Sequence, residues 1–229
     1  MRANSNIYYN QLDLNNKSLK VSSYLNTVNR LVELHSKKPV EDYLDVGCGD
    51  GQRTQGLLEA LQPSRSTLID PSKSMITLAR SRSIAPCIQT SILEFDTTDR
   101  YDVITCLWNV LGHLDTPDER VAALRKMRSL LKEDGYLFID FNNRYNIKNY
   151  GLYAVALNFV KDVFCVSSRG WYPLDSVSSV YIHSFYESYR LLKRSGLRIE
   201  HDHHIDYESG TPVTSPWFGQ SFFVVTKDA

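Results

Sequence analysis

The sequence predicts a doubly wound α/β fold with a mostly parallel sheet, and two features of its pattern support this. Short apolar runs of the kind that form buried strands alternate with amphipathic helical stretches between residues 40 and 141. Turns that contain glycine or proline separate these runs. Because such alternation builds right-handed βαβ units, we expect a ligand site at the carboxyl ends of the parallel strands.

The expected elements follow from local patterns. We expect helices over 18–36, 52–61, 72–82, 117–131 and 186–194, and another near 151–165. The expected strands cover 40–46, 66–70, 88–93, 102–107, 136–141, 197–207 and 221–227. The clearest helix start is Thr116-Pro-Asp-Glu119, a capping box with proline at the first helical position.

Length and composition exclude several classes of protein. The 229 residues are 42% hydrophobic and 23% charged, which is typical of a globular domain with a full core. Lys+Arg and Asp+Glu are both 26, and this neutral balance argues against nucleic acid as the main partner. Charged or polar residues interrupt the most apolar stretch, 151–166, so we expect no membrane partner. The polar N-terminus does not resemble a signal peptide, and we therefore expect a cytoplasmic protein.

No metal centre is predicted. The four cysteines are scattered without a C-x-x-C pair, so neither structural zinc nor a disulfide framework is expected. The run His201-Asp-His203-His204 has metal-binding side chains. On a strand, however, His201 and His203 share one face while His204 points to the other, and no further ligand stands at a suitable spacing.

The strongest functional signal is the sequence Asp45-Val-Gly47-Cys-Gly49-Asp-Gly51 after the first expected strand. Glycines let a backbone turn sharply and approach a ligand closely. Asp70 ends the next strand, where a carboxylate can accept hydrogen bonds from both hydroxyls of a ribose. A dinucleotide site would require glycine or alanine at the position of Gln52, which makes a nicotinamide-dependent oxidoreductase improbable.

The form D-x-G-x-G-x-G at residues 45–51 resembles motif I of the class I S-adenosylmethionine-dependent methyltransferases. The resemblance covers residues 40–141 with specific motifs and extends more loosely to residue 227. It implies S-adenosylmethionine as the cofactor and a Rossmann-like sheet of seven strands with the last antiparallel. We expect one domain over 1–229, with an N-terminal helical segment (1–36) and an insertion before the last two strands (142–183) that fold over the cofactor as a lid.

The resemblance also implies which residues bind the cofactor. The glycine loop would accommodate its methionine part, Asp45 would hold the amino group directly or through water, and Asp70 would bind the ribose. The family's usual acid after the third strand is replaced by Ser91, so the Ser91 hydroxyl, the Ile92 N–H or Glu94 could contact the adenine amino group. The complete expected set is Asp45, Gly47, Cys48, Gly49, Asp70, Pro71, Met75, Ser91, Ile92 and Leu107.

Residues 106–114, after the fourth strand, correspond to the substrate-facing segment of the family. Together with the sequence FIDFNNRYN they resemble small-molecule N-methyltransferases of the glycine, sarcosine or amino-sugar type. His113 is the best candidate for a catalytic base because the ordinary pKa of histidine lies near neutrality, and the alternative is that it only holds the loop after the fourth strand by hydrogen bonds. Aromatic residues that could line the site or pack as lid core are Tyr8, Tyr9, Trp108, Trp171, Tyr172 and Trp217.

These observations predict an enzyme that methylates a small molecule, with an amine acceptor favoured over a hydroxyl. Two alternatives keep the cofactor: methylation of RNA or protein, and cofactor binding without catalysis. The neutral charge and the lack of an Asn/Asp-Pro-Pro-Tyr signature after the fourth strand argue against RNA. The sequence does not predict the oligomeric state.

Overall fold

The computed structural model describes residues 23–36, 39–82, 85–176 and 178–228. The strands of its main sheet are β1 (Asp42–Val46), β2 (Arg65–Asp70), β3 (Cys87–Gln89), β4 (Tyr101–Cys106), β5 (Leu131–Phe141), β8 (Leu197–Ile205), β9 (Pro212–Val213) and β10 (Gln220–Lys227). Their order is β3-β2-β1-β4-β5-β10-β8-β9. Neighbouring strands from β3 to β5 are parallel, whereas β10 is antiparallel to both β5 and β8. The α/β class and the antiparallel last strand are confirmed, and β9 is a two-residue strand beyond the seven expected.

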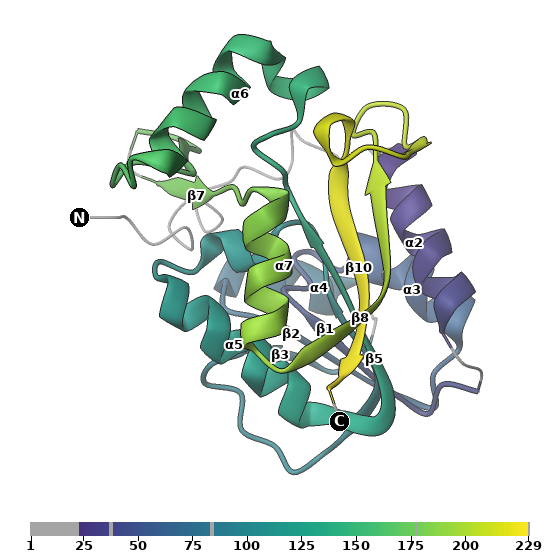
Figure 1. Ribbon diagram of the computed structural model, residues 1–229. Coiled ribbons are helices and arrows are strands. Elements are labelled where there is room, and N and C mark those ends of the chain that lie inside the picture. The colour runs from purple at the N-terminus through teal and green to yellow at the C-terminus, as the bar shows by residue number, and fades with distance from the viewer. Residues whose placement is uncertain (1–22, 37–38, 83–84, 177, 229) are drawn as a thin grey trace.

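Helices cover both faces of the sheet (Figure 1). They are α2 (Ser23–His35), α3 (Gln52–Leu61), α4 (Lys73–Ser81), α5 (Pro117–Leu130), α6 (Ile147–Val163) and α7 (Phe185–Arg194), with short 3-10 turns η1 (Val110–His113) and η2 (Pro216–Phe218). The Thr116–Glu119 capping box is present at the start of α5, as expected. Among the described residues, no helix has the length and apolar character needed to cross a membrane.

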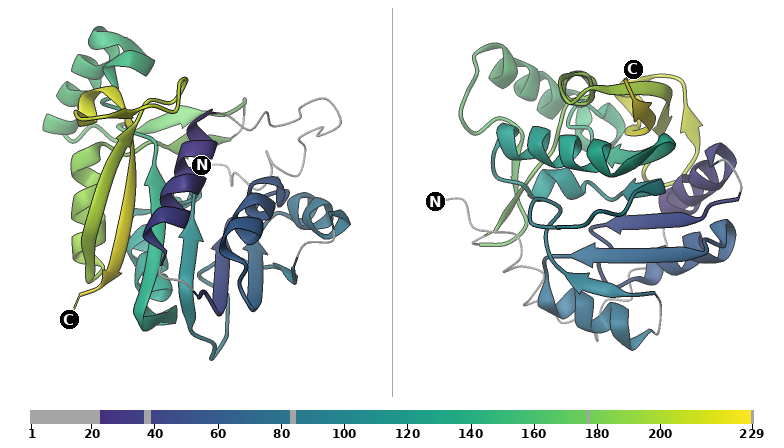
Figure 2. Two further views of the ribbon diagram at one scale, coloured as in Figure 1. Left: turned by 90° about the vertical axis from the view of Figure 1, so that its right-hand side faces the viewer. Right: turned by 90° about the horizontal axis from the view of Figure 1, so that it is seen from below.

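The two faces of the sheet carry separate apolar clusters, because successive side chains of a strand point to opposite faces. Leu44, Ile104 and Ile139 pack with α5 and α7. Their neighbours in the chain, such as Tyr43 and Phe138, pack with α2 and α3. Figure 2 shows the sheet between these two helix layers. The polar residues of the α2/α3 face lie at the carboxyl ends of the strands.

Three elements differ from the sequence prediction. β3 has only three residues, because the chain turns at Ser91 with the Phe95 N–H donating to the Ser91 carbonyl (2.9 Å). β5 begins at Leu131 rather than residue 136, with a shift of register against β4 before Tyr136. α6 begins at Ile147 and is kinked at Gly151, whose φ is 77°.

The segment between β5 and α7 forms a separate layer beyond the end of the sheet, consisting of α6 and a ribbon of β6 (Trp171–Pro173) and β7 (Ser179–Tyr181) (Figure 1). The Arg144 side chain, 1% exposed, anchors this layer through ion pairs to Asp162 (2.6 Å) and to Glu187 of α7 (2.5 Å). These elements occupy most of residues 142–183, which are called the insertion from here on, as in the sequence prediction. The action of the insertion as a lid stays a prediction.

Replacing Leu124 of α5 by alanine should destabilise the fold strongly. Leu124 is fully buried against the sheet, and truncation of such a leucine costs about 2–5 kcal/mol of unfolding free energy. Leu34→Ala on α2 is the matched control, because Leu34 is 73% exposed and should change the unfolding free energy by less than about 0.5 kcal/mol. Urea denaturation of both variants tests this, and equal midpoints would contradict the assignment of the core.

Candidate active site

The glycine loop between β1 and α3 has a fixed backbone and one open side. The Gly47 and Cys48 N–H groups both donate to the Ile69 carbonyl of β2 (2.8 and 3.1 Å). Gly47 has a φ of 73°, and a Cβ there would lie 2.5 Å from the Val110 side chain of η1, so glycine is required. At Gly49, with a φ of 58°, a Cβ would meet no atom of the described residues within 4 Å. Within the part of the chain that the structure describes, the loop thus presents its backbone to open space at Gly49.

Asp70 joins the end of β2 to this loop. One carboxylate oxygen accepts the Gly49 N–H (3.0 Å) and the other accepts the Ser72 N–H (2.8 Å) at the start of α4. Burial raises the pKa of Asp70, and these two hydrogen bonds oppose the rise without cancelling it. Each oxygen keeps a second lone pair, so the carboxylate can still accept hydrogen bonds from two hydroxyls of a ligand.

The residues expected around an adenine gather beside Asp70. Met75 in the first turn of α4 and Ile92 after β3 are both buried. The Ser91 hydroxyl donates to a Glu94 carboxylate oxygen (2.9 Å), so the three alternative adenine contacts lie in one turn. The Thr90 N–H donates to the Asp70 carbonyl (3.1 Å), which holds this turn against the end of β2.

Asp45 braces the loop from inside the protein. Its side chain is fully buried and accepts hydrogen bonds from the guanidinium of Arg53 (3.0 Å), from the hydroxyl of Thr54 and from that of Thr105 (2.8 Å). These partners come from α3 and β4, so the carboxylate ties the carboxyl ends of two strands to the helix after the loop. Its expected contact with a ligand amino group stays a prediction.

Arg53 provides a donor that the described residues do not use. Its Nη2 atom binds Asp45, but its Nη1 atom is buried without a hydrogen-bond partner in the described part of the chain. The side chain is only 7% exposed, and an unsatisfied buried donor is costly. A carboxylate on a ligand would satisfy this atom. The sequence prediction missed Arg53, although an arginine placed two residues after a glycine loop is a visible signal.

The segment after β4 lies against the glycine loop. Cys106 and Leu107 are buried, and the next two residues, Trp108 and Asn109, have left-handed φ values of 74° and 55°. His113 in η1 is half-buried, and burial lowers its pKa to about 4. At neutral pH its imidazole is therefore uncharged and has one nitrogen atom that can accept a proton. It is a weaker base than an ordinary histidine.

Three of the aromatic candidates pack on side chains of the insertion, Trp171 and Tyr172 from within it and Trp217 from η2. Trp171 packs edge-on to Tyr181 (5.4 Å between ring centroids), and Trp217 stacks on Tyr145 (5.5 Å). Tyr172 lies 5.7 Å from Tyr150. Trp108 packs against the apolar cluster of the α2/α3 face, while Tyr8 and Tyr9 lie outside the described residues.

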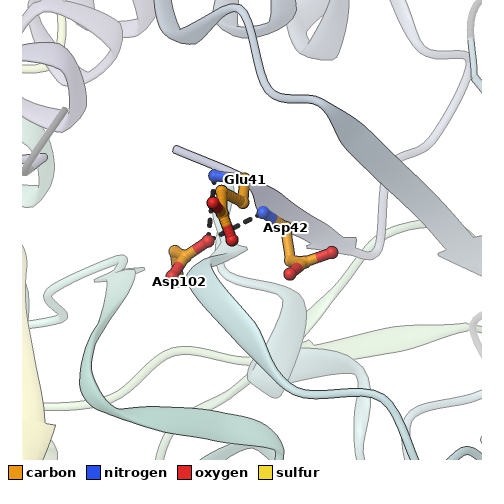
Figure 3. Close-up of side chains that lie close together, drawn as sticks. All are labelled: Glu41, Asp42 and Asp102. Atoms are coloured by element: carbon orange, nitrogen blue, oxygen red, sulfur yellow. Dashed lines mark hydrogen bonds between the residues drawn. The ribbon is translucent and has the colours of Figure 1, made fainter. Parts of the chain in front are cut away.

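Two further clusters of ionisable side chains lie away from this edge. Glu41, Asp42 and Asp102 meet where β1 and β4 begin (Figure 3). The Lys132 ammonium lies 2.8 Å from Asp42 and 3.0 Å from Asp102 and so supplies the cationic partner of these acids. Hydrogen bonding to Asp42 and Asp102 raises the pKa of Lys132.

The histidine cluster is on β8, where His201 and His203 share a face as predicted. His35 of α2 joins them, with its Nε2 atom 3.1 Å from that of His203. This contact depends on how the chain packs and was not visible in the sequence. Burial lowers the pKa of both His35 and His203, which is consistent with a neutral hydrogen-bonded pair.

Comparisons with known proteins agree with this architecture. A family described as "Methyltransferase domain" matches residues 44–137, which include the glycine loop, Asp70 and the segment after β4. The ubiquinone biosynthesis O-methyltransferase of Glaesserella parasuis is 31% identical over 128 residues, which are 51% of this chain and 51% of that protein. The dTDP-3-amino-3,6-dideoxy-alpha-D-glucopyranose N,N-dimethyltransferase of Streptomyces fradiae is 27% identical over 48% of this chain and 42% of its own length. The chain thus spans about half the length of these curated relatives.

Solved structures show the same fold over nearly the whole chain. An S-adenosylmethionine-dependent methyltransferase from Clostridium acetobutylicum superposes with a TM-score of 0.66 at 16% identity, covering 97% of both chains. The N-methyltransferase NodS from Bradyrhizobium japonicum, solved with S-adenosyl-L-homocysteine, gives 0.64 at 16% identity over 98% of this chain and 97% of its own. Residues 44–137 thus match a methyltransferase domain, and the chain as a whole has the fold of these solved methyltransferases.

Proposed function

We propose that this protein transfers a methyl group from S-adenosylmethionine to a small molecule, with an amine as the acceptor. The observation that carries the cofactor assignment is the Asp70 carboxylate at the end of β2, hydrogen-bonded to Gly49 of a glycine loop with open space beside it. This arrangement fits a nucleoside whose ribose binds Asp70 and whose remainder runs along the loop.

The buried donor of Arg53 extends this fit to the other end of the cofactor. The methionine part of S-adenosylmethionine carries a carboxylate, and the unsatisfied Nη1 atom of Arg53 lies behind the loop that would accommodate it. Charge-assisted hydrogen bonds between a guanidinium and a carboxylate are among the stronger polar contacts in proteins. In this proposal Asp45 orients Arg53, and Arg53 binds the ligand.

When bound, S-adenosylmethionine supplies a sulfonium-activated methyl group, so the protein itself has to position the acceptor and exclude water. The backbone of Trp108 and Asn109, fixed beside the loop, is suited to positioning. His113 is neutral at physiological pH and can accept a hydrogen bond from an N–H of a neutral amine, which would orient the amine lone pair, while the proton of the methylated ammonium is lost to solvent. The insertion and the N-terminal segment would close the site as a lid.

The low pKa of His113 favours an amine over a hydroxyl acceptor. A neutral amine attacks with its own lone pair, whereas a hydroxyl has to lose a proton during or before attack. A base with a pKa of about 4 provides little driving force for that proton transfer at pH 7. The curated relatives named above include both an O-methyltransferase and an N,N-dimethyltransferase, so hydroxyl acceptors are the second candidate and belong in the test.

Asp70→Asn should weaken binding of S-adenosylhomocysteine about 10- to 100-fold, because charge-assisted hydrogen bonds contribute about 1.5–3 kcal/mol. Isothermal titration calorimetry measures this directly, with NAD as a control ligand. Asp96→Asn is the matched control, since Asp96 is exposed in the loop between β3 and β4. Binding of NAD in place of S-adenosylhomocysteine would overturn the cofactor assignment. Unchanged affinity in Asp70→Asn would overturn the placement of the ribose.

His113→Asn should lower kcat by about tenfold at most, because it removes one positioning hydrogen bond worth about 0.5–1.5 kcal/mol, with S-adenosylhomocysteine affinity unchanged within about twofold. Turnover is followed as S-adenosylhomocysteine release with pooled amines and, separately, pooled phenols and alcohols. His201→Asn is the control, because His201 is exposed on β8. Turnover confined to the hydroxyl pool would refute the amine assignment, and an unchanged kcat would leave His113 with a structural role.

A further inference from the structure

Two consecutive residues in the site adopt a left-handed backbone conformation, which is uncommon for residues other than glycine and asparagine and is disfavoured by a bulky side chain such as that of Trp108. Trp108 and Asn109 have φ values of 74° and 55°, and both carry a Cβ that crowds the following carbonyl in this region. Such geometry persists only where surrounding contacts determine it, and it concentrates at functional sites.

The main contact is the carboxylate of Asp140. Asp140 lies on β5 between Ile139 and Phe141, whose side chains point to the opposite face, and it is 2% exposed. One of its oxygens accepts the Asn109 N–H at 2.8 Å, and the carboxylate also accepts the Trp108 N–H. A single buried carboxylate therefore binds the backbone of both left-handed residues. Burial raises the pKa of Asp140, and these bonds together with the nearby Arg53 oppose the rise.

Asn109 extends the same connection to the insertion. The Nδ2 group of its side chain donates to the Tyr181 carbonyl of β7 (3.1 Å), and the Oδ1 atom of the same side chain accepts the Asn142 N–H (3.2 Å). A Cβ at Gly112 would overlap the Asn109 amide, so the turn of η1 also closes around this side chain. The left-handed pair is thus fixed from both β5 and the insertion.

The second oxygen of Asp140 reaches α2. It accepts the hydroxyl of Tyr24 at 3.0 Å, and Tyr24 is itself 1% exposed. Burial raises the pKa of Tyr24, and the charge of Asp140 and its hydrogen bond with the phenol raise it further, so the phenol stays a proton donor at physiological pH. Tyr24 is in the first turn of α2, the helix at the end of the N-terminal segment.

We infer that Asp140 is a positioning residue that sets the backbone of Trp108 and Asn109 for methyl transfer, and that Tyr24 makes this setting depend on the docking of α2. The inference rests on the proposed function, since it assigns that segment to the cofactor and acceptor side of the site. In-line transfer requires the reacting groups to be held to well within 1 Å, so a shift of this backbone lowers binding and rate together.

The test uses Tyr24→Phe and Asp140→Asn in the full chain, with two readouts. Hydrogen–deuterium exchange of residues 107–112 reports the N–H groups held by Asp140 and needs no ligand. Titration with S-adenosylhomocysteine reports the site. We expect exchange in this segment to be at least threefold faster in Tyr24→Phe and faster still in Asp140→Asn. Affinity should fall about threefold in the first variant and at least tenfold in the second.

Tyr189→Phe is the matched control, because the Tyr189 hydroxyl also donates to a carboxylate, that of Asp202 on β8, away from this site. It should change neither readout by more than about twofold. Unchanged exchange in residues 107–112 of a folded Tyr24→Phe protein would overturn the coupling to α2, even if Asp140→Asn does not fold. Unaltered affinity in both folded variants would overturn the positioning role. Failure of the unmodified protein to bind S-adenosylhomocysteine, with exchange as expected, would instead count against the proposed function.

Discussion

The site depends on a row of buried polar groups at the carboxyl ends of three central strands. Asp45 of β1, Thr105 of β4 and Asp140 of β5 all point to the α2/α3 face, where α3 supplies Arg53. Charges are expensive to bury unless they are paired or hydrogen-bonded, so the groups in this row have few alternative arrangements. Asp45, at one end of this row, binds Arg53 of the helix that follows the glycine loop. Asp140, at the other end, binds the backbone of the segment after β4. The relative positions of the glycine loop and this segment are therefore set by the same network.

This network explains why a rigid site can be built from loops. The loop after β1 is held by Asp45 and Asp70, and the loop after β4 is held by Asp140. In each case a carboxylate from a strand end accepts backbone or side-chain donors of the neighbouring segment. A parallel sheet brings such strand ends to one edge, because every crossover returns the chain in the same direction. The fold thus brings the strand ends together, and the hydrogen bonds of the carboxylates fix the positions of the loops.

The sequence predicted the elements that local patterns determine. The strands β1, β2 and β4, the capping box of α5 and the placement of the glycine loop and Asp70 at one edge all follow from short motifs. What it could not provide were contacts between distant segments, such as that of Tyr24 with Asp140, 116 residues apart. The isolated acid in the apolar strand FIDF was a visible signal for Asp140, since a charge in such a run requires partners. Its partners, however, depend on packing.

Two parts of the proposed site depend on contacts of different range in the sequence. In the proposed function the glycine loop and Asp70 bind groups that every nucleoside cofactor of this kind presents, and short motifs are sufficient to encode them. The left-handed pair Trp108–Asn109 is held by β5, by the insertion and by α2, which are distant in sequence. Asp140 joins β5 to α2, and the Asn109 side chain joins this pair to β7. If the pair lies on the acceptor side as proposed, a change in the packing of any of these parts would alter that side, whereas the proposed cofactor contacts depend on strand ends of the sheet alone.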